Sequence, residues 1–141
     1  MAVAALIDAG PLIAAGSRQD RHRAIAVEFL DRFAGTFYTT WPVLTEACHL
    51  MPKEGALRLL RWASRGGIEV YEVPPVALEP IAGMMEKYAD LPMDLADASL
   101  VWLADEIGIR DIATFDERDF ATYRLASGKR FNNLLAMRKR Q

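Results

Sequence analysis

Short apolar runs alternate along this chain with longer segments in which apolar residues return every three or four positions. A short continuous apolar run predicts a buried strand, and the longer period predicts an amphipathic helix. Strands are predicted at 3–8, 36–39, 68–73 and 111–115, with a weaker candidate at 130–135. This alternation is typical of an α/β protein with a mainly parallel sheet.

Proline and glycine residues mark the ends of the predicted helices. Pro42 suits the first turn of a helix that must end before Pro52, because proline lacks the N–H that a helix interior needs. Gly108 ends the helix predicted at 94–107, since glycine is favoured just past a helix end. Helices are predicted at 21–33, 42–51, 53–64, 75–87 and 94–107, and a frayed tail at 138–141.

Composition narrows the class of protein. With 141 residues and 52% hydrophobic composition, the chain is expected to form a single domain over 1–141 with a substantial core. The apolar run 100–104 is far shorter than the roughly 20 residues of a membrane span, and the N-terminus is not that of a signal peptide. A single cysteine, Cys48, excludes an intramolecular disulfide and a cysteine-based zinc site, and it fits a cytoplasmic protein.

Four acidic residues lie in or beside apolar stretches: Asp8, Glu46, Asp97 and Asp116. Asp8 closes the apolar run 3–7 without a basic neighbour in the sequence, and Asp116 follows the run 112–115. A buried carboxylate needs a partner, because an isolated charge withdrawn from water neutralises or destabilises the fold. A divalent metal ion is the most economical partner for several carboxylates at once, and it indicates hydrolytic phosphate chemistry.

The predicted topology brings these four acids to one edge of the sheet. In a parallel sheet the strand ends and the starts of the following helices share the carboxyl edge, where ligands usually bind. Asp8 and Asp116 stand at strand ends, while Glu46 and Asp97 stand in the first turns of helices. By helical phase Asp97 projects toward the buried side of its helix, whereas Asp94 projects toward water. Asp97 is therefore the better candidate ligand of this pair.

Each acid alone also has a purely structural explanation. Asp94 can cap its helix, and Asp97 then lies favourably against the helix dipole. Glu46 can be a surface residue on a helix flank, and Asp116 can begin a turn or a short helix. Asp8 is the hardest to explain this way, since it ends a wholly apolar strand. Four such acids on one rim favour the functional interpretation.

These residues and their order resemble those of PIN-domain ribonucleases, in particular the toxin of bacterial VapBC toxin–antitoxin pairs. The resemblance covers nearly the whole chain and rests on the segments 5–8, 44–47, 94–100 and 113–120, the last close to the family pattern Thr-x-Asp-x-x-Phe. It implies a three-layer α/β/α PIN-like fold, Mg²⁺ or Mn²⁺, cleavage of RNA, a homodimer and a cognate antitoxin. One departure is that Ala9 supplies no hydroxyl where members of the family often carry serine or threonine.

Candidate roles follow from the chemistry of oxygen ligands. Mg²⁺ prefers oxygen atoms in octahedral geometry and is usually held by one or two carboxylates. Asp8, Asp97 and Asp116 are the candidate metal ligands, and Glu46 is expected to bind through water or to orient the nucleophile. Thr114 is expected to hold a carboxylate or a water by hydrogen bond, and Asp94 to support the site from its helix cap. His22 and His49 have no metal-ligand spacing.

RNA binding needs other residues, because the acids repel phosphate and the net charge is −2. Arg58, Arg61 and Arg65 fall in one helical stripe with Trp62 beside them, and Arg18 and Arg21 cluster before another helix. Either group could contact phosphates. A solvated helix face is the alternative explanation for every one of these arginines.

Two other functions remain open from the sequence. A strand-end aspartate can be a phosphoacceptor, but haloacid-dehalogenase-like phosphatases usually have a second acid two residues later, where this chain has Gly10. Response-regulator receivers usually place the phosphoacceptor after a middle strand. The second of these functions is that of a catalytically inert PIN-like module that binds RNA or protein, and the presence of all four acids argues against it.

Overall fold

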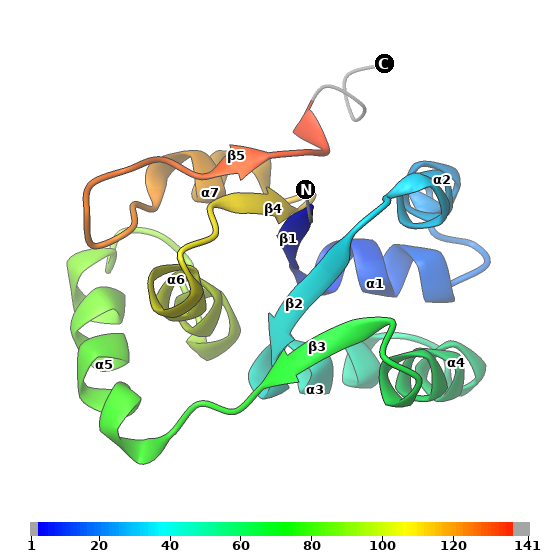
Figure 1. Ribbon diagram of the computed structural model, residues 1–141, viewed down its shortest axis with the longest axis horizontal. Helices are drawn as coiled ribbons and strands as arrows, with labels where there is room; N and C mark the ends of the chain where they lie inside the picture. Colours follow the sequence, from blue (N-terminus) through cyan, green and yellow to red (C-terminus); the bar gives the residue numbers. More distant parts are fainter. Residues whose placement is uncertain (1–2, 137–141) are drawn as a thin grey trace.

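The computed structural model describes residues 3–136 and contains a central sheet of five parallel strands in the order β3-β2-β1-β4-β5 (Figure 1). The strands are β1 (Ala4–Ile7), β2 (Thr36–Thr40), β3 (Ile68–Tyr71), β4 (Asp111–Ala113) and β5 (Asn132–Asn133). β1 lies in the middle, with β2 and β4 as its neighbours, and its residues Ala5, Leu6 and Ile7 are fully buried. The first apolar run of the sequence therefore forms the central strand of the core.

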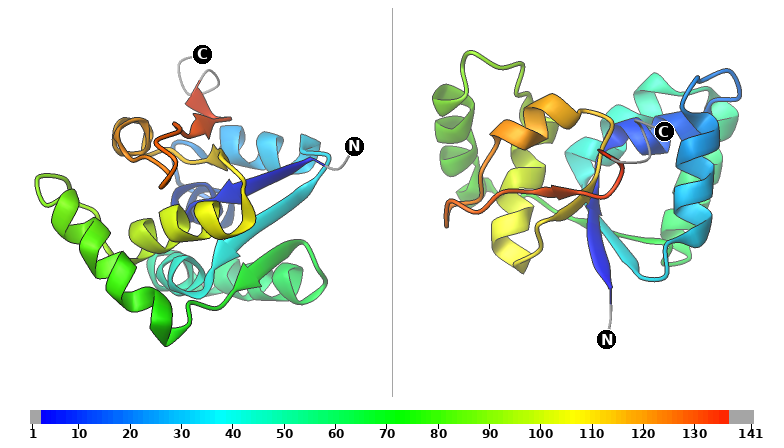
Figure 2. Two further views of the ribbon diagram at one scale, coloured as in Figure 1. Left: turned by 60° about the vertical axis from the view of Figure 1, so that its left-hand side comes forward. Right: turned by 90° about the horizontal axis from the view of Figure 1, so that it is seen from above.

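Helices cover both faces of the sheet, as Figure 2 shows: α1, α2 and α4 lie on one side, and α5 and α6 lie on the other. They are α1 (Ala9–Gly16), α2 (Arg23–Arg32), α3 (Trp41–Leu50), α4 (Lys53–Ser64), the 3₁₀ turn η1 (Pro75–Ala77), α5 (Leu78–Lys87), α6 (Leu95–Ile107) and α7 (Glu117–Thr122). Helix α3 packs on both α1 and α6, and α5 packs on the outside of α6. Among the described residues, no helix is both long and apolar enough to cross a membrane.

The predicted three-layer α/β/α fold with a mainly parallel sheet is confirmed. The predicted helix at 53–64 has the bounds of α4, and the segment 75–87 begins as a 3₁₀ turn before it becomes helical. The strand expected at 130–135 is reduced to two residues, and the expected tail at 138–141 lies outside the described residues. The sequence did not predict α1 at all.

Helix α1 forms because Asp8 caps it. The Asp8 carboxylate accepts a hydrogen bond from the backbone N–H of Ala9, and Pro11 stands in the first turn, where no intrahelical N–H partner is needed. Gly10 and Pro11 therefore do not break the helix. The consequence is that Asp8 is held at the junction between the central strand and the helix that follows it.

Glycines allow α1 and α4 to cross at close range. A Cβ atom on Gly55 would overlap the carbonyl oxygen of Gly16, so only glycine fits at this position of α4. The contact anchors the helix layer on one side of the sheet, and it keeps the end of α1 fixed relative to α4.

We expect Gly55→Ala to destabilise the protein by about 1–3 kcal/mol, because the new methyl group meets backbone rather than a flexible side chain. The matched control is Gly83→Ala in α5, where a Cβ meets no atom within 4 Å. That substitution should stabilise the protein by about 0.5–1 kcal/mol through helix propensity. Urea unfolding of both variants measures the difference, and equal effects would contradict the close crossing.

Candidate active site

Asp8 is buried at the carboxyl end of β1, with 6% of its surface exposed. One carboxylate oxygen accepts the N–H of Ala9 at 2.8 Å, and the other accepts the hydroxyl of Thr114 at 2.8 Å. Thr114 directly follows β4, so this hydrogen bond joins the ends of two neighbouring strands. The carboxylate therefore has a fixed orientation.

Thr114 also orients Asp116. Its hydroxyl oxygen accepts the backbone N–H of Asp116 at 2.9 Å while its proton is donated to Asp8. Asn133 of β5 clamps Thr114 in turn, because its amide accepts the Thr114 N–H at 3.3 Å and donates to the Thr114 carbonyl at 3.0 Å. Asn133 is a residue that the sequence did not reveal, since β5 is too short to be recognised by its pattern.

The start of α6 brings two more carboxylates to this edge. Asp94 is the N-cap and accepts the N–H of Asp97 at 2.9 Å, and the Asp97 carboxylate accepts the Asp94 N–H at 3.4 Å. Asp97 is 9% exposed, whereas Asp94 is exposed. The arrangement agrees with the helical phases: Asp94 faces water as a helix cap, and Asp97 faces inward.

A pair of buried hydroxyl groups ties α6 to the start of α3, the helix that carries Glu46. The Ser99 hydroxyl donates to the carbonyl of Ala96 at 2.7 Å and lies 2.6 Å from the Thr40 hydroxyl, so Thr40 is the donor between them. Thr40 is also the N-cap of α3. These two residues lie 59 positions apart, and no local pattern in the sequence indicates their contact.

Five acids at this edge of the sheet are linked by electrostatic interactions, and we call them the acidic rim: Asp8, Glu46, Asp94, Asp97 and Asp116. Burial raises the pKa of Asp8, and Asp94 raises it further against the opposing effect of the Thr114 and Ala9 hydrogen bonds. Burial, followed by the charges of Asp8, Asp94 and Asp116, raises the pKa of Asp97 to about 8. Burial, followed by a hydrogen bond and charge from Asp94, raises the pKa of Glu46 to about 7.

The donor set of the acidic rim fits a hard divalent cation, because it consists of carboxylate oxygens that repel one another. Among residues 3–136, no three acidic, histidine or cysteine side chains are grouped closely enough to hold one ion together. A single ion at the rim would therefore use one or two of these carboxylates directly, with water for its other ligands, which is the usual pattern for Mg²⁺.

Tyr123 lies behind the acidic rim. Its side chain is fully buried, and its hydroxyl is the one buried side-chain polar atom that lacks a hydrogen-bond partner within the described part of the chain. Burial raises the pKa of Tyr123, and the charges of Asp97 and Asp119 raise it further. Its hydroxyl therefore stays protonated near neutral pH and feels the field of the rim.

The candidate RNA-binding arginines are exposed and come together only in part. Arg18 and Arg58 line one cavity of about 400 Å³ beyond the end of α1, and Arg61 and Arg65 continue along α4. Arg21 precedes His22, whose ring stacks on Phe115 at 4.7 Å between centroids. Because Phe115 is the neighbour of Asp116, this stack brings the connection between α1 and α2 close to the acidic rim.

Comparison with known proteins supports the family resemblance. No family model matches the chain. It is 29% identical over 130 residues to Ribonuclease VapC26 of Mycobacterium tuberculosis, in an alignment that covers 89% of this chain and 96% of that protein. The resemblance to VapC-type PIN-domain ribonucleases is thereby confirmed.

The fold is also that of a solved VapC structure. The crystal structure of Mycobacterium tuberculosis VapC20, described as a Sarcin-Ricin loop cleaving toxin, superposes with a TM-score of 0.73 at 17% sequence identity. The superposition covers 81% of this chain and 90% of VapC20. The three-layer architecture is thus shared although few residues are identical.

The raised pKa values predict that the metal-free protein loses stability as the pH rises. Asp97 and Glu46 bind protons more tightly in the folded state, so their contribution is complete below about pH 4 and is lost as the pH passes through about 7 to 8. In EDTA the melting temperature should therefore fall between about pH 5 and pH 8.

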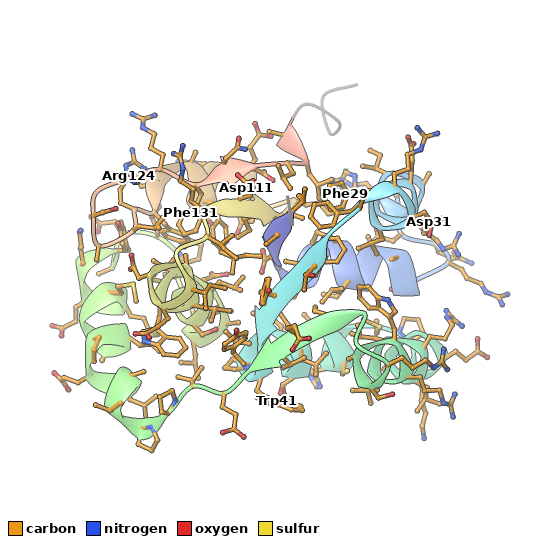
Figure 3. All side chains as sticks on the ribbon, viewed as in Figure 1. Phe29, Asp31, Trp41, Asp111, Arg124 and Phe131 are labelled. Atoms are coloured by element: carbon orange, nitrogen blue, oxygen red, sulfur yellow. The ribbon has the colours of Figure 1, made fainter. Side chains whose placement is uncertain are left out.

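Asp97→Asn should flatten this dependence, because an asparagine oxygen can still accept the Asp94 N–H but carries no charge. The control is Asp31→Asn, which removes an exposed carboxylate from α2 (labelled in Figure 3) and leaves the rim intact. Thermal melts over this pH range test both variants. Identical slopes for the wild type and Asp97→Asn would show that the rim carboxylates do not repel one another.

Proposed function

We propose that this chain is a metal-dependent endoribonuclease that hydrolyses RNA phosphodiester bonds and acts as the toxin of a toxin–antitoxin pair. The observation that carries the proposal is the acidic rim, in which burial and the charges of Asp8 and Asp94 raise the pKa of both Glu46 and Asp97. The similarity to Ribonuclease VapC26 along nearly the whole chain supports the same reaction class.

We infer that the ligands for Mg²⁺ or Mn²⁺ come from Asp8, Asp97 and Asp116, one or two of them in direct contact with the ion and the rest through water. A bound ion would polarise the phosphodiester and lower the pKa of a coordinated water. The hydrogen bonds from Thr114 keep Asp8 and the backbone of Asp116 in place, and the Asp94 cap fixes the start of the helix that carries Asp97. Ligands that are oriented in this way lose less entropy when the site closes on its substrate.

Glu46 is proposed to act on the attacking water. Its pKa of about 7 places it close to the pH at which a carboxylate can most effectively accept a proton, whereas an ordinary glutamate would be too weak a base. A nearby cation would lower this pKa, so the charge at the site sets the working pH range of Glu46.

The second part of the proposal concerns the binding partners. Arg18, Arg58, Arg61 and Arg65, with Arg21 near the rim, are proposed to hold the phosphates of the RNA substrate. A homodimer and a cognate antitoxin are proposed from the family resemblance. Their support is the exposure of large apolar side chains, which on a soluble domain often marks a surface that another protein covers: Leu57, Leu60, Val76 and Leu78.

We expect Asp8→Asn to lower Mn²⁺-dependent RNA cleavage by about 100-fold or more, because it removes a proposed ligand from the centre of the rim. Thr114→Val keeps the ligand but removes the hydrogen bond that orients it, so cleavage should fall by about 10- to 100-fold. Asp31→Asn should cleave like the wild type.

Cleavage of a labelled RNA, with EDTA as the metal-free reference and circular dichroism as a test of folding, measures these effects. Full activity of a folded Asp8→Asn protein would contradict the proposal. Metal-independent cleavage would contradict the role of the ion, and the absence of cleavage with any RNA would favour a binding module.

A further inference from the structure

An apolar cleft adjoins the acidic rim and has no assigned role. It has a volume of about 590 Å³ and lies between the starts of α3 and α6. Its lining includes Trp41, Pro42 and Leu95 as apolar surface, and it shares Glu46 and Asp94 with the rim. The volume falls within the roughly 300–1,000 Å³ that is typical of small-molecule sites.

Trp41 is the most unusual residue of this cleft. It is the first residue of α3 and 49% exposed, and Figure 3 shows it at the surface of the molecule. Trp62 and Trp102, by contrast, are partly buried and pack against the core. Leu95, which is 45% exposed, also lines the cleft. An indole ring with half its surface in water costs solvation free energy that burial against a flat partner would recover.

Charge decides what kind of partner fits. Neither lysine nor arginine is among the described residues that line the cleft, and the imidazole of His49 is its one basic group, whereas the two carboxylates of Glu46 and Asp94 border it. A phosphate group is therefore unsuited to it, and a neutral aromatic ring is suited. A protein that covered the cleft would also have to bury Glu46 and Asp94 against its own surface, which is costly for unpaired carboxylates.

We propose that this cleft binds a nucleobase of the RNA substrate, stacked on the indole ring of Trp41, next to the phosphate that is cleaved at the rim. The inference rests on the proposed ribonuclease function and adds a positioning residue to it. Single-stranded RNA is commonly held by bases that stack on aromatic side chains, because every base offers a π face. Trp41 thus fixes which phosphate reaches the acids without touching the phosphate itself.

The geometry supports separate roles for Trp41, which stacks on the base, and Glu46, which accepts the proton. The Thr45 hydroxyl donates to the carbonyl of Trp41 at 2.8 Å, and Pro42 follows in the first turn, so the backbone that carries the indole is firmly held. Glu46 lies five positions later in the same helix, so the stacking platform and the proposed proton acceptor move as one rigid unit. A base seated on Trp41 would therefore be positioned directly relative to Glu46.

Binding of short RNA in Ca²⁺, which suppresses cleavage, tests the inference. Two RNAs are compared: a single-stranded oligonucleotide with all its bases, and an abasic chain of the same length. Trp41→Ala and Trp41→Leu should weaken binding of the first about 5- to 100-fold, and Trp41→Phe should retain most of the affinity. The abasic chain should bind the wild type and all three variants alike, because no base is left to stack.

Trp41→Leu separates stacking from a merely apolar contact, since leucine keeps apolar area but has no ring. Val3→Ala, which shortens a side chain that is 48% exposed and outside the cleft, serves as the control and should leave both affinities unchanged. Melting temperatures of the variants confirm that they are folded.

Light scattering of the same variants is the second readout. A mass in solution that falls on Trp41→Ala would show that the cleft is a contact between protein chains and would overturn the inference. Equal binding of the intact RNA by the wild type and Trp41→Leu would overturn it as well, while Mn²⁺-dependent cleavage by the wild type would leave the ribonuclease function standing. A wild type that neither binds nor cleaves RNA would contradict both the nucleobase site and the ribonuclease function.

Discussion

Withdrawal of several carboxylates from water at one edge of the sheet is the constraint on which this structure depends. A charged carboxylate in a protein interior costs several kcal/mol unless hydrogen bonds or opposite charges compensate it. Here the compensation is partial: Asp8 accepts two hydrogen bonds and Asp97 accepts one, while burial and the charges of neighbouring acids still raise the pKa of both. In the metal-free protein the burial and mutual repulsion of these carboxylates cost free energy, and the binding of a cation or of protons would lower that cost.

Hydrogen bonds between neutral polar groups hold the elements that carry the rim acids at one edge of the sheet. Thr114 joins the ends of β1 and β4, Asn133 holds Thr114 from β5, and the Thr40–Ser99 pair holds α3 and α6 at the same edge. The hydrophobic core fixes the strands, but these neutral groups fix the angles of the side chains. Precision at the rim comes from them, because mutually repelling acids could not hold one another in place.

The sequence predicted the elements with strong periodicity and missed what depends on tertiary contacts. The inward position of Asp97 and the outward position of Asp94 followed from helical phase because α6 is long and regular. Helix α1 was missed because it is short and contains Gly10 and Pro11, which are poor helix formers; an aspartate cap and the free N–H groups of a first turn make both acceptable. Contacts between distant residues, and the exposure of Trp41, depend on which element packs beside each side chain, and no local pattern records that.

Proton release on metal binding tests the central claim most directly. If burial and repulsion keep Asp97 and Glu46 partly protonated near neutral pH, an ion that binds at the rim must displace those protons. Titration calorimetry with Mn²⁺ at pH 7, in buffers of different ionisation enthalpy, should show a net release of about one proton per ion. The release should shrink in Asp97→Asn and persist in Asp31→Asn, which leaves the rim intact. Binding heats that do not depend on the buffer would contradict the account, and so would an absence of binding by the folded protein.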